Sequence, residues 1–186
     1  MQSCEQTQGM SIYQHGVSVN DYFHDLYNHI IHKEQLKFEW KLPDWIYESS
    51  LWKNALPLKI INEYQIFHDC GKPFALSIDE DGKRHFPNHA EISKNTWLQY
   101  NNVTDDNIQI ADLIGMDMDI HLLKDTGIDE FCKRNEAATL LLTGLAEIHS
   151  NASMFGGIES ISFKTKFKSI NKRGKKITTY LMEKSQ

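Results

Sequence analysis

This sequence has few cysteines, no long apolar run and no excess of positive charge, and each of these features argues against a class of protein. The three cysteines, Cys4, Cys70 and Cys132, form no CxxC pair, which argues against a disulfide scaffold or a zinc–thiolate site and favours a reducing cytoplasm. No apolar run of about 18 residues or more occurs, so we expect no membrane span and no membrane partner. The formal net charge of -5 argues against nonspecific coating of nucleic acid, which requires clustered lysine and arginine.

What the sequence does have is the length and composition of one ordinary globular domain. Its 186 residues are 40% hydrophobic and 24% charged, and no internal repeat or flexible linker divides them. We therefore expect a single domain over residues 1–186. The polar N-terminus lacks the apolar stretch of a secretory signal, and we expect residues 1–10 to be poorly ordered. The sequence indicates no particular oligomeric state.

Apolar residues spaced three and four apart predict helices over most of the chain. Such spacing covers residues 17–32, 58–68, 88–100, 105–123 and 135–150. Residues 158–170 largely alternate between apolar and polar, which is typical of a half-buried strand, and a turn at 172–174 leads to a second strand over 177–181. We therefore predict a mainly α fold, a helical bundle with a small C-terminal β-hairpin over 158–182.

One segment is strongly basic. Residues 164–176 hold seven lysines or arginines and no acidic residue. A solvated pair of strands is the simpler interpretation of this segment. The alternative is an edge that faces the phosphates of an RNA or nucleotide substrate.

The strongest chemical signal is the pair His68-Asp69, followed by Gly71-Lys72, at the end of a predicted helix. An imidazole nitrogen and a carboxylate oxygen at neighbouring positions can bind one divalent metal ion, and the turn after them can leave the ion open to a substrate. A His-Asp pair alone is common by chance, but the glycine and lysine that follow make the pattern more specific. Gly71 lets the backbone approach closely, and Lys72 supplies a mobile cation for a phosphate oxygen.

On these residues the sequence resembles the HD superfamily of phosphohydrolases. Members of that superfamily are helical and bind divalent metal through a first histidine, a His-Asp doublet and a later acidic residue. The resemblance implies that His68 and Asp69 are metal ligands and that the first ligand stands in an early helix, for which His15 is our choice. His29 and His32 are alternatives because they lie closer to the doublet in the sequence, as is more usual in the family.

The same resemblance implies a later carboxylate ligand, for which the sequence offers two candidates. Asp117 stands four residues before His121, so the two share one face of a predicted helix, whereas Asp119 points away. A plain surface position is the other interpretation of Asp117. Glu147 stands in an apolar helix where the family has an aspartate, and its longer side chain departs from that pattern. Both carboxylates can bind if two metal ions are present.

A narrower resemblance covers residues 67–97. This stretch is similar to the HD domain attached to bacterial CCA-adding tRNA nucleotidyltransferases, in which a comparable turn leads to a histidine that opens a helix. Such domains remove phosphate from RNA ends and open 2′,3′-cyclic phosphates. The resemblance implies that His89 faces the metal or the scissile phosphate and acts in catalysis with Asp69 and Lys72. Lys72, His89 and His121 are then the expected substrate contacts.

These residues together predict a metal-dependent phosphohydrolase that acts on RNA ends or nucleotides, as a 2′,3′-cyclic phosphodiesterase or phosphatase. The metal is Mn, Fe, Co, Ni, Zn or Mg, and mixed histidine and carboxylate ligation does not choose among them. A 5′-nucleotidase or nucleoside triphosphate hydrolase is the first alternative. A noncatalytic module that binds nucleotide or RNA is the second.

Overall fold

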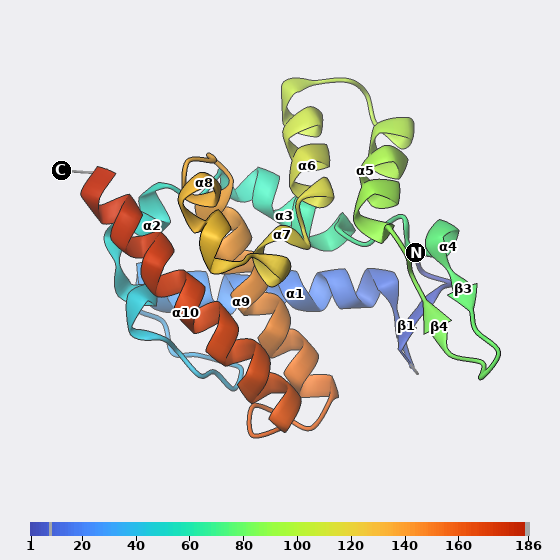
Figure 1. Cartoon of the computed structure of the whole chain (residues 1–186), viewed down its shortest axis with the longest axis horizontal. Coiled ribbons are helices and arrows are strands. Elements are labelled where there is room, and N and C mark those ends of the chain that lie inside the picture. The colour runs from blue at the N-terminus through green and yellow to red at the C-terminus, as the bar shows by residue number, and fades with distance from the viewer. Residues whose placement is uncertain (8, 185–186) are drawn as a thin grey trace. The chain divides into compact units, whose positions relative to one another are not determined.

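The computed structural model describes residues 1–7 and 9–184, which form two compact units, each built from two stretches of the chain (Figure 1). The first unit comprises Met1–Ser18 and Leu58–Met118. The second comprises Val19–Pro57 and the described residues from Asp119 onward. The single domain expected over 1–186 stays a prediction. No helix in the described ranges is both long enough and apolar enough to cross a membrane.

The first unit is a small helical assembly in which α5 and α3 pack against α6. Its buried core includes Ile61, Leu113 and Ile114. A hydroxyl cap starts α6, because the Thr104 side chain accepts a hydrogen bond from the Asn107 N–H. Its elements are β1 (Glu5–Thr7), β2 (Met10–Ser11), the start of α1 (Ile12–Tyr27), α3 (Leu58–Phe67), α4 (Lys72–Ala75), β3 (Ser77–Ile78), β4 (Arg84–His85), α5 (His89–Tyr100) and α6 (Asp105–Gly115).

The second unit is organised around α9, most of whose residues are buried. The long helix α10, red in Figure 1, packs against α9, α2 and α8. Its elements are the rest of α1, the π-helical turn η1 (Asn28–His32), the 3₁₀ turn η2 (Asp44–Tyr47), α2 (Ser49–Lys53), α7 (Asp119–Leu122), the 3₁₀ turn η3 (Asp125–Gly127), α8 (Ile128–Cys132), α9 (Ala137–Met154) and α10 (Ile161–Lys184).

The mainly helical class is confirmed, and the predicted helices over 58–68, 88–100 and 135–150 correspond to α3, α5 and α9. The first helix begins at Ile12, five residues earlier than predicted. The reason is a reciprocal cap: the Gln14 N–H donates to Ser11 Oγ at 3.2 Å, and the Ser11 N–H donates to Gln14 Oε1 at 2.8 Å.

The C-terminal hairpin predicted over 158–182 is wrong, because this segment forms α10. The buried residues of α10 recur at helical spacings of three and four, so its apolar side chains lie along one helix face. Gly174 is not a turn residue. A Cβ at this position would lie 2.2 Å from Cε2 of Trp45, so the glycine allows α10 and η2 to approach closely.

Small antiparallel hairpins do occur, but in the first unit. Strand β3 pairs with β4, and β1 pairs with β2. Apart from Ser11, the second pair falls within residues 1–10, which we expected to be poorly ordered, so that expectation is wrong for Glu5–Thr7 and Met10. Gln8, which the same expectation covered, lies outside the described residues.

Candidate metal centre

Three of the predicted metal ligands gather in the first unit. His15 stands in the first turn of α1, and His68 and Asp69 form the turn that follows α3. All three residues are at most 2% exposed. Asp69 Oδ2 lies 3.2 Å from His68 Nε2 and 3.9 Å from His15 Nε2, and the two imidazole centroids are 5.3 Å apart. The structure thus brings His15 close to the doublet, and its role as the first metal ligand stays a prediction.

The ring of His68 is fixed by a backbone contact. Its Nδ1 lies 2.7 Å from the carbonyl oxygen of Gln65, which can only accept, so Nδ1 carries the hydrogen. A hydrogen on Nδ1 leaves Nε2, on the Asp69 side, with the lone pair that a metal needs. Asp69 Oδ1 is buried and makes no hydrogen bond within the described ranges. Two imidazoles and a carboxylate at these distances fit a divalent transition-metal ion.

Lys72 is not the mobile cation that the sequence suggested. It is buried at the start of α4, and its Nζ lies 2.6 Å from Asp69 Oδ2 and 3.0 Å from Gln6 Oε1 on β1. Burial alone would raise the pKa of Asp69, but the neighbouring His68, Lys72 and His15 hold it well below its usual range. The lysine therefore neutralises a buried carboxylate.

Gly71 also plays a different part from the one expected. A Cβ at Gly71 would lie 2.3 Å from the backbone nitrogen of Ser93, so the close approach is to α5. The Gly71 N–H donates to Ser93 Oγ at 2.9 Å, and Cys70 Sγ lies 3.3 Å from the Ser93 carbonyl oxygen. Burial raises the pKa of the Cys70 thiol to about 11, which makes it a structural residue rather than a nucleophile. Ser93 thus fixes the turn that carries His68 and Asp69.

His89 opens α5, as predicted, and lies near the cluster. Its Nδ1 lies 3.0 Å from the carbonyl oxygen of Phe86, and its Nε2 lies 3.7 Å from Asp69 Oδ1. The side chain of His89 is 20% exposed, in contrast to the buried ligands. His89 can therefore meet both solvent and the cluster.

Asp117 lies in the first unit but is neither on a helix with His121 nor on the surface. Helix α6 ends at Gly115 and α7 begins at Asp119, so the predicted shared face does not exist. The Met116 N–H donates hydrogen bonds to the carbonyl oxygens of Asp112 and Leu113 and so ends α6. Asp117 is buried and accepts a hydrogen bond from the Tyr64 hydroxyl at 2.7 Å.

His121 and Glu147 belong to the second unit, where they form a pair. His121 Nε2, on α7, lies 2.8 Å from Glu147 Oε2, on α9. Glu147 is therefore engaged with a histidine, and its role as a metal ligand stays a prediction from the sequence. The alternatives His29 and His32 lie in η1 of the second unit, and His29 Nδ1 contacts the Glu34 carbonyl oxygen at 2.8 Å.

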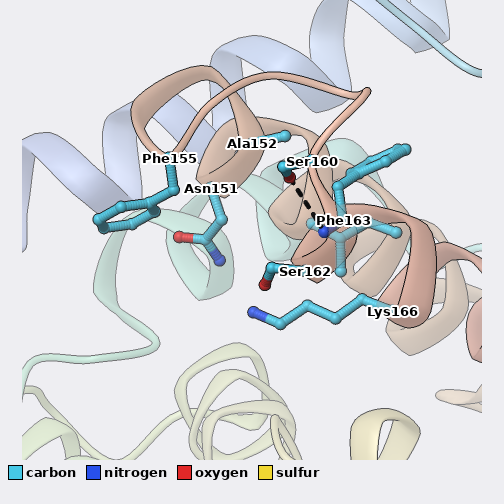
Figure 2. Close-up of a pocket in the computed structure, with 8 residues that line it drawn as sticks. Asn151, Ala152, Phe155, Ser160, Ser162, Phe163 and Lys166 are labelled. Atoms are coloured by element: carbon cyan, nitrogen blue, oxygen red, sulfur yellow. Dashed lines mark hydrogen bonds between the residues drawn. The ribbon is translucent and has the colours of Figure 1, made fainter.

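The basic segment 164–176 lies on α10 and not on a pair of strands. Lys166 lines a cavity of about 60 Å³ at the junction of α9 and α10, where the polar ends of Asn151 and Ser162 point toward the same space (Figure 2). Ser160 Oγ caps the helix start beside it by accepting from the Phe163 N–H at 3.2 Å. The cavity holds about two waters by volume and is too small for a nucleotide.

Several residues around the cluster were not found from the sequence. Tyr64, which donates to Asp117, stands on α3 four residues before His68, and this spacing could have indicated it. Gln65 acts through its backbone carbonyl, which no side-chain pattern reveals. Gln6 contacts Lys72 and Ser93 contacts Gly71 only through folding, because both stand far from these residues in the sequence.

Comparisons with protein-family models, with curated proteins and with solved structures gave no match for this chain. The resemblance to the HD superfamily therefore rests on the residues themselves. The geometry of those residues is the basis for the function proposed below.

Proposed function

We propose that this chain is a metal-dependent phosphohydrolase that acts on RNA ends or nucleotides. The observation that supports the proposal is the buried cluster of His15, His68 and Asp69 in the first unit. Burying a carboxylate beside two imidazoles is costly unless the groups are paired or bind an ion, and such clusters are concentrated at functional sites. The cysteines are all free, and we keep the cytoplasm as the proposed location.

His15, His68 and Asp69 would hold the metal. When bound, a divalent ion supplies Lewis acidity to a phosphoryl oxygen and lowers the pKa of a bound water. His89 Nδ1 donates to the Phe86 carbonyl oxygen, so Nε2, at 3.7 Å from Asp69 Oδ1, carries a hydrogen only when the ring is doubly protonated, and in that form it can donate a hydrogen bond to the charge that develops on a phosphate oxygen. Lys72 acts through Asp69 and is better described as a positioning residue.

The test is phosphate release from 2′,3′-cyclic nucleotides, 3′-phosphate RNA and 5′-nucleotides, each tried with Mn, Co, Ni, Mg and Zn. We expect metal-dependent release by the wild type and a loss of about 100-fold or more in His68→Ala and Asp69→Ala. His32→Ala is the matched control, because His32 is an exposed histidine of the second unit. The preferred substrate then distinguishes an enzyme that acts on RNA ends from a 5′-nucleotidase.

Metal content provides the second measurement. The wild type is expected to bind divalent metal in equilibrium dialysis, and the two doublet variants are expected to bind it weakly. A wild type that neither releases phosphate nor binds metal would refute the proposal. Loss of activity in His32→Ala would favour one of the alternative first ligands over His15.

A further inference from the structure

An aromatic pocket lies next to the doublet in the first unit. The cavity measures about 370 Å³, within the range of roughly 300–1,000 Å³ that is usual for small-molecule sites. Its lining includes Phe67 and Cys70, the two residues that flank His68 and Asp69 in the chain. A molecule bound in this pocket would therefore contact the same turn that carries the doublet.

Four aromatic side chains from three helices line this aromatic pocket. Phe67 and Trp97 pack together with ring centroids 5.4 Å apart, and the Trp97 Nε1–H donates to the Asn107 carbonyl oxygen at 3.1 Å. These two contacts hold the rings in place on one side of the pocket. Phe74 on α4 and Tyr100 on α5 are 67% and 70% exposed. Exposed rings beside a fixed aromatic wall provide faces on which a flat ring can stack.

The polar side chains of the pocket mainly offer hydrogen-bond acceptors. Thr96 Oγ1 donates its hydrogen to the Ile92 carbonyl oxygen at 2.7 Å, and Asn101 Nδ2 donates to the Trp97 carbonyl oxygen at 2.9 Å. Thr96 Oγ1 and Asn101 Oδ1 thus keep lone pairs for a ligand, beside the second hydrogen of Asn101 Nδ2. Glu63 adds a carboxylate and Met1 a backbone amine, and no lysine, arginine or histidine side chain is among the described lining residues.

This chemistry selects the kind of ligand. The negative charge of Glu63 and the lack of basic lining side chains disfavour a phosphate inside the pocket. Acceptor groups beside stacking faces favour a flat ring that donates hydrogen bonds from an amino group. A nucleobase with an exocyclic amino group meets both conditions, and its phosphate would remain outside, on the side of the doublet.

We propose that the aromatic pocket binds the base of a nucleotide or RNA-end substrate, with preference for a base that carries an exocyclic amino group. The inference rests on the proposed function, since it assigns a second part of the same substrate. Phe74 and Tyr100 stack on the base, and Glu63 accepts from the amino group.

Nucleosides test the pocket without any hydrolysis, because they carry no phosphate. Binding of adenosine and of purine riboside, which has the same ring without the amino group, is measured by calorimetry on the full chain. We expect adenosine to bind about fivefold more tightly or better. Tyr100→Ala should weaken both nucleosides by about fivefold or more through lost stacking. Glu63→Ala should weaken adenosine and leave purine riboside unchanged.

Glu91→Ala is the matched control, because Glu91 is an exposed carboxylate on α5 outside the pocket lining. Equal affinities of the two nucleosides, an unaffected Tyr100→Ala variant, or no nucleoside binding at millimolar concentration would each overturn the inference. Hydrolysis of nucleotides without any nucleoside binding would refute the base site and leave the proposed function intact. The expected nucleoside binding without hydrolysis in the presence of any metal would support the base site and refute the proposed hydrolase activity.

Discussion

The ion pair between Lys72 and Asp69 is the residue-scale feature that most affects the cluster. A buried carboxylate is costly unless a charge lies against it, and removing one partner of such a pair leaves the other uncompensated. Lys72 supplies this charge at 2.6 Å. The same carboxylate is a proposed metal ligand, so lysine and metal stabilise it in the same way.

The Lys72→Met variant keeps the apolar stem and removes the ammonium. In EDTA we expect the free energy of unfolding to fall by about 3 kcal/mol, the usual effect of breaking a buried ion pair. With saturating Mn²⁺ the loss should be smaller, because the ion then compensates Asp69. Urea unfolding in the two buffers measures both values.

Lys59→Met is the control for this comparison. Lys59 pairs with Asp106 at 2.7 Å, but both side chains are largely exposed, so the variant should change stability little in either buffer. Equal losses in Lys72→Met with and without metal would contradict a carboxylate shared between lysine and ion.

His149 gives the second unit a dependence on pH. Its Nδ1 lies 2.8 Å from the Leu145 carbonyl oxygen, and its Nε2 accepts from the Lys41 N–H at 3.1 Å, an arrangement that requires the neutral ring. Burial lowers the pKa of His149 to about 4, against about 6.5 for an unfolded chain. As the pH falls from 6.5 toward 4, the unfolded state takes up a proton that the folded state does not, so stability decreases.

The loss from this one group amounts to about 3 kcal/mol once the pH has fallen to 4, and to roughly half of that at pH 5 to 5.5. Urea unfolding at pH 7 and pH 5 in EDTA measures it. The ring of His149 packs against those of Trp40 and Phe163, with centroids 4.3 and 4.8 Å away, so His149→Phe can occupy the same aromatic site. This variant should lose less stability between the two pH values. An unchanged pH dependence would assign the effect to other groups.

At the scale of single elements, the contact between α10 and η2 depends on a glycine. Alanine is normally the better helix residue by about 1 kcal/mol. At Gly174, however, a Cβ would lie 2.2 Å from Trp45, whose Nε1–H also donates to Asn171 Oδ1 on α10 at 3.0 Å. We therefore expect Gly174→Ala to destabilise the protein by about 1–3 kcal/mol, as overpacking does.

Thermal unfolding followed by circular dichroism checks this expectation. Lys168→Ala is the control, because Lys168 is exposed on the same helix and the substitution removes no buried contact. A Gly174→Ala variant that is more stable than the wild type would contradict the close approach of α10 to Trp45.

The contrast between α9 and α10 shows what local sequence can and cannot predict. The apolar residues of α9 fit only a buried helix, and the prediction was correct within a few residues. In α10 the first apolar residues fit both an alternating and a helical pattern, and Gly174 resembled a turn. Packing against Trp45 and α9 stabilises the helical form. Because both are distant in the sequence, a local pattern of residues cannot indicate these contacts.

The same limit applies to the candidate site. His68 and Asp69 were found because they are adjacent and followed by Gly71, and His15 because of a family pattern. The residues that hold the turn after the doublet come from other segments: Ser93 on α5 accepts from the Gly71 N–H, and Gln6 on β1 accepts from Lys72. Candidate ligands that are adjacent in the sequence can therefore be predicted from it. The residues that hold them in place come together only when the chain folds.

At the scale of the whole molecule, each unit is built from two separated stretches of chain. In the first unit, His15 comes from one stretch and the doublet from the other. An ion held by both stretches would bind the folded chain and not the unfolded one. Binding of this kind adds about 2.7 kcal/mol to the free energy of unfolding when the free ion is at 100 times its dissociation constant.

For a chain of this length, such a gain corresponds to a rise in Tm of about 5–10 °C. We expect saturating Mn²⁺ or Co²⁺ to produce this rise in the wild type, measured by differential scanning calorimetry against an EDTA reference. His15→Gln should abolish most of the rise, because the first stretch then offers no imidazole to the ion. His24→Gln, on the same helix but in the second unit, should keep it. If the two variants lose the rise equally, the ion is held elsewhere, and His15 is not the link between the stretches.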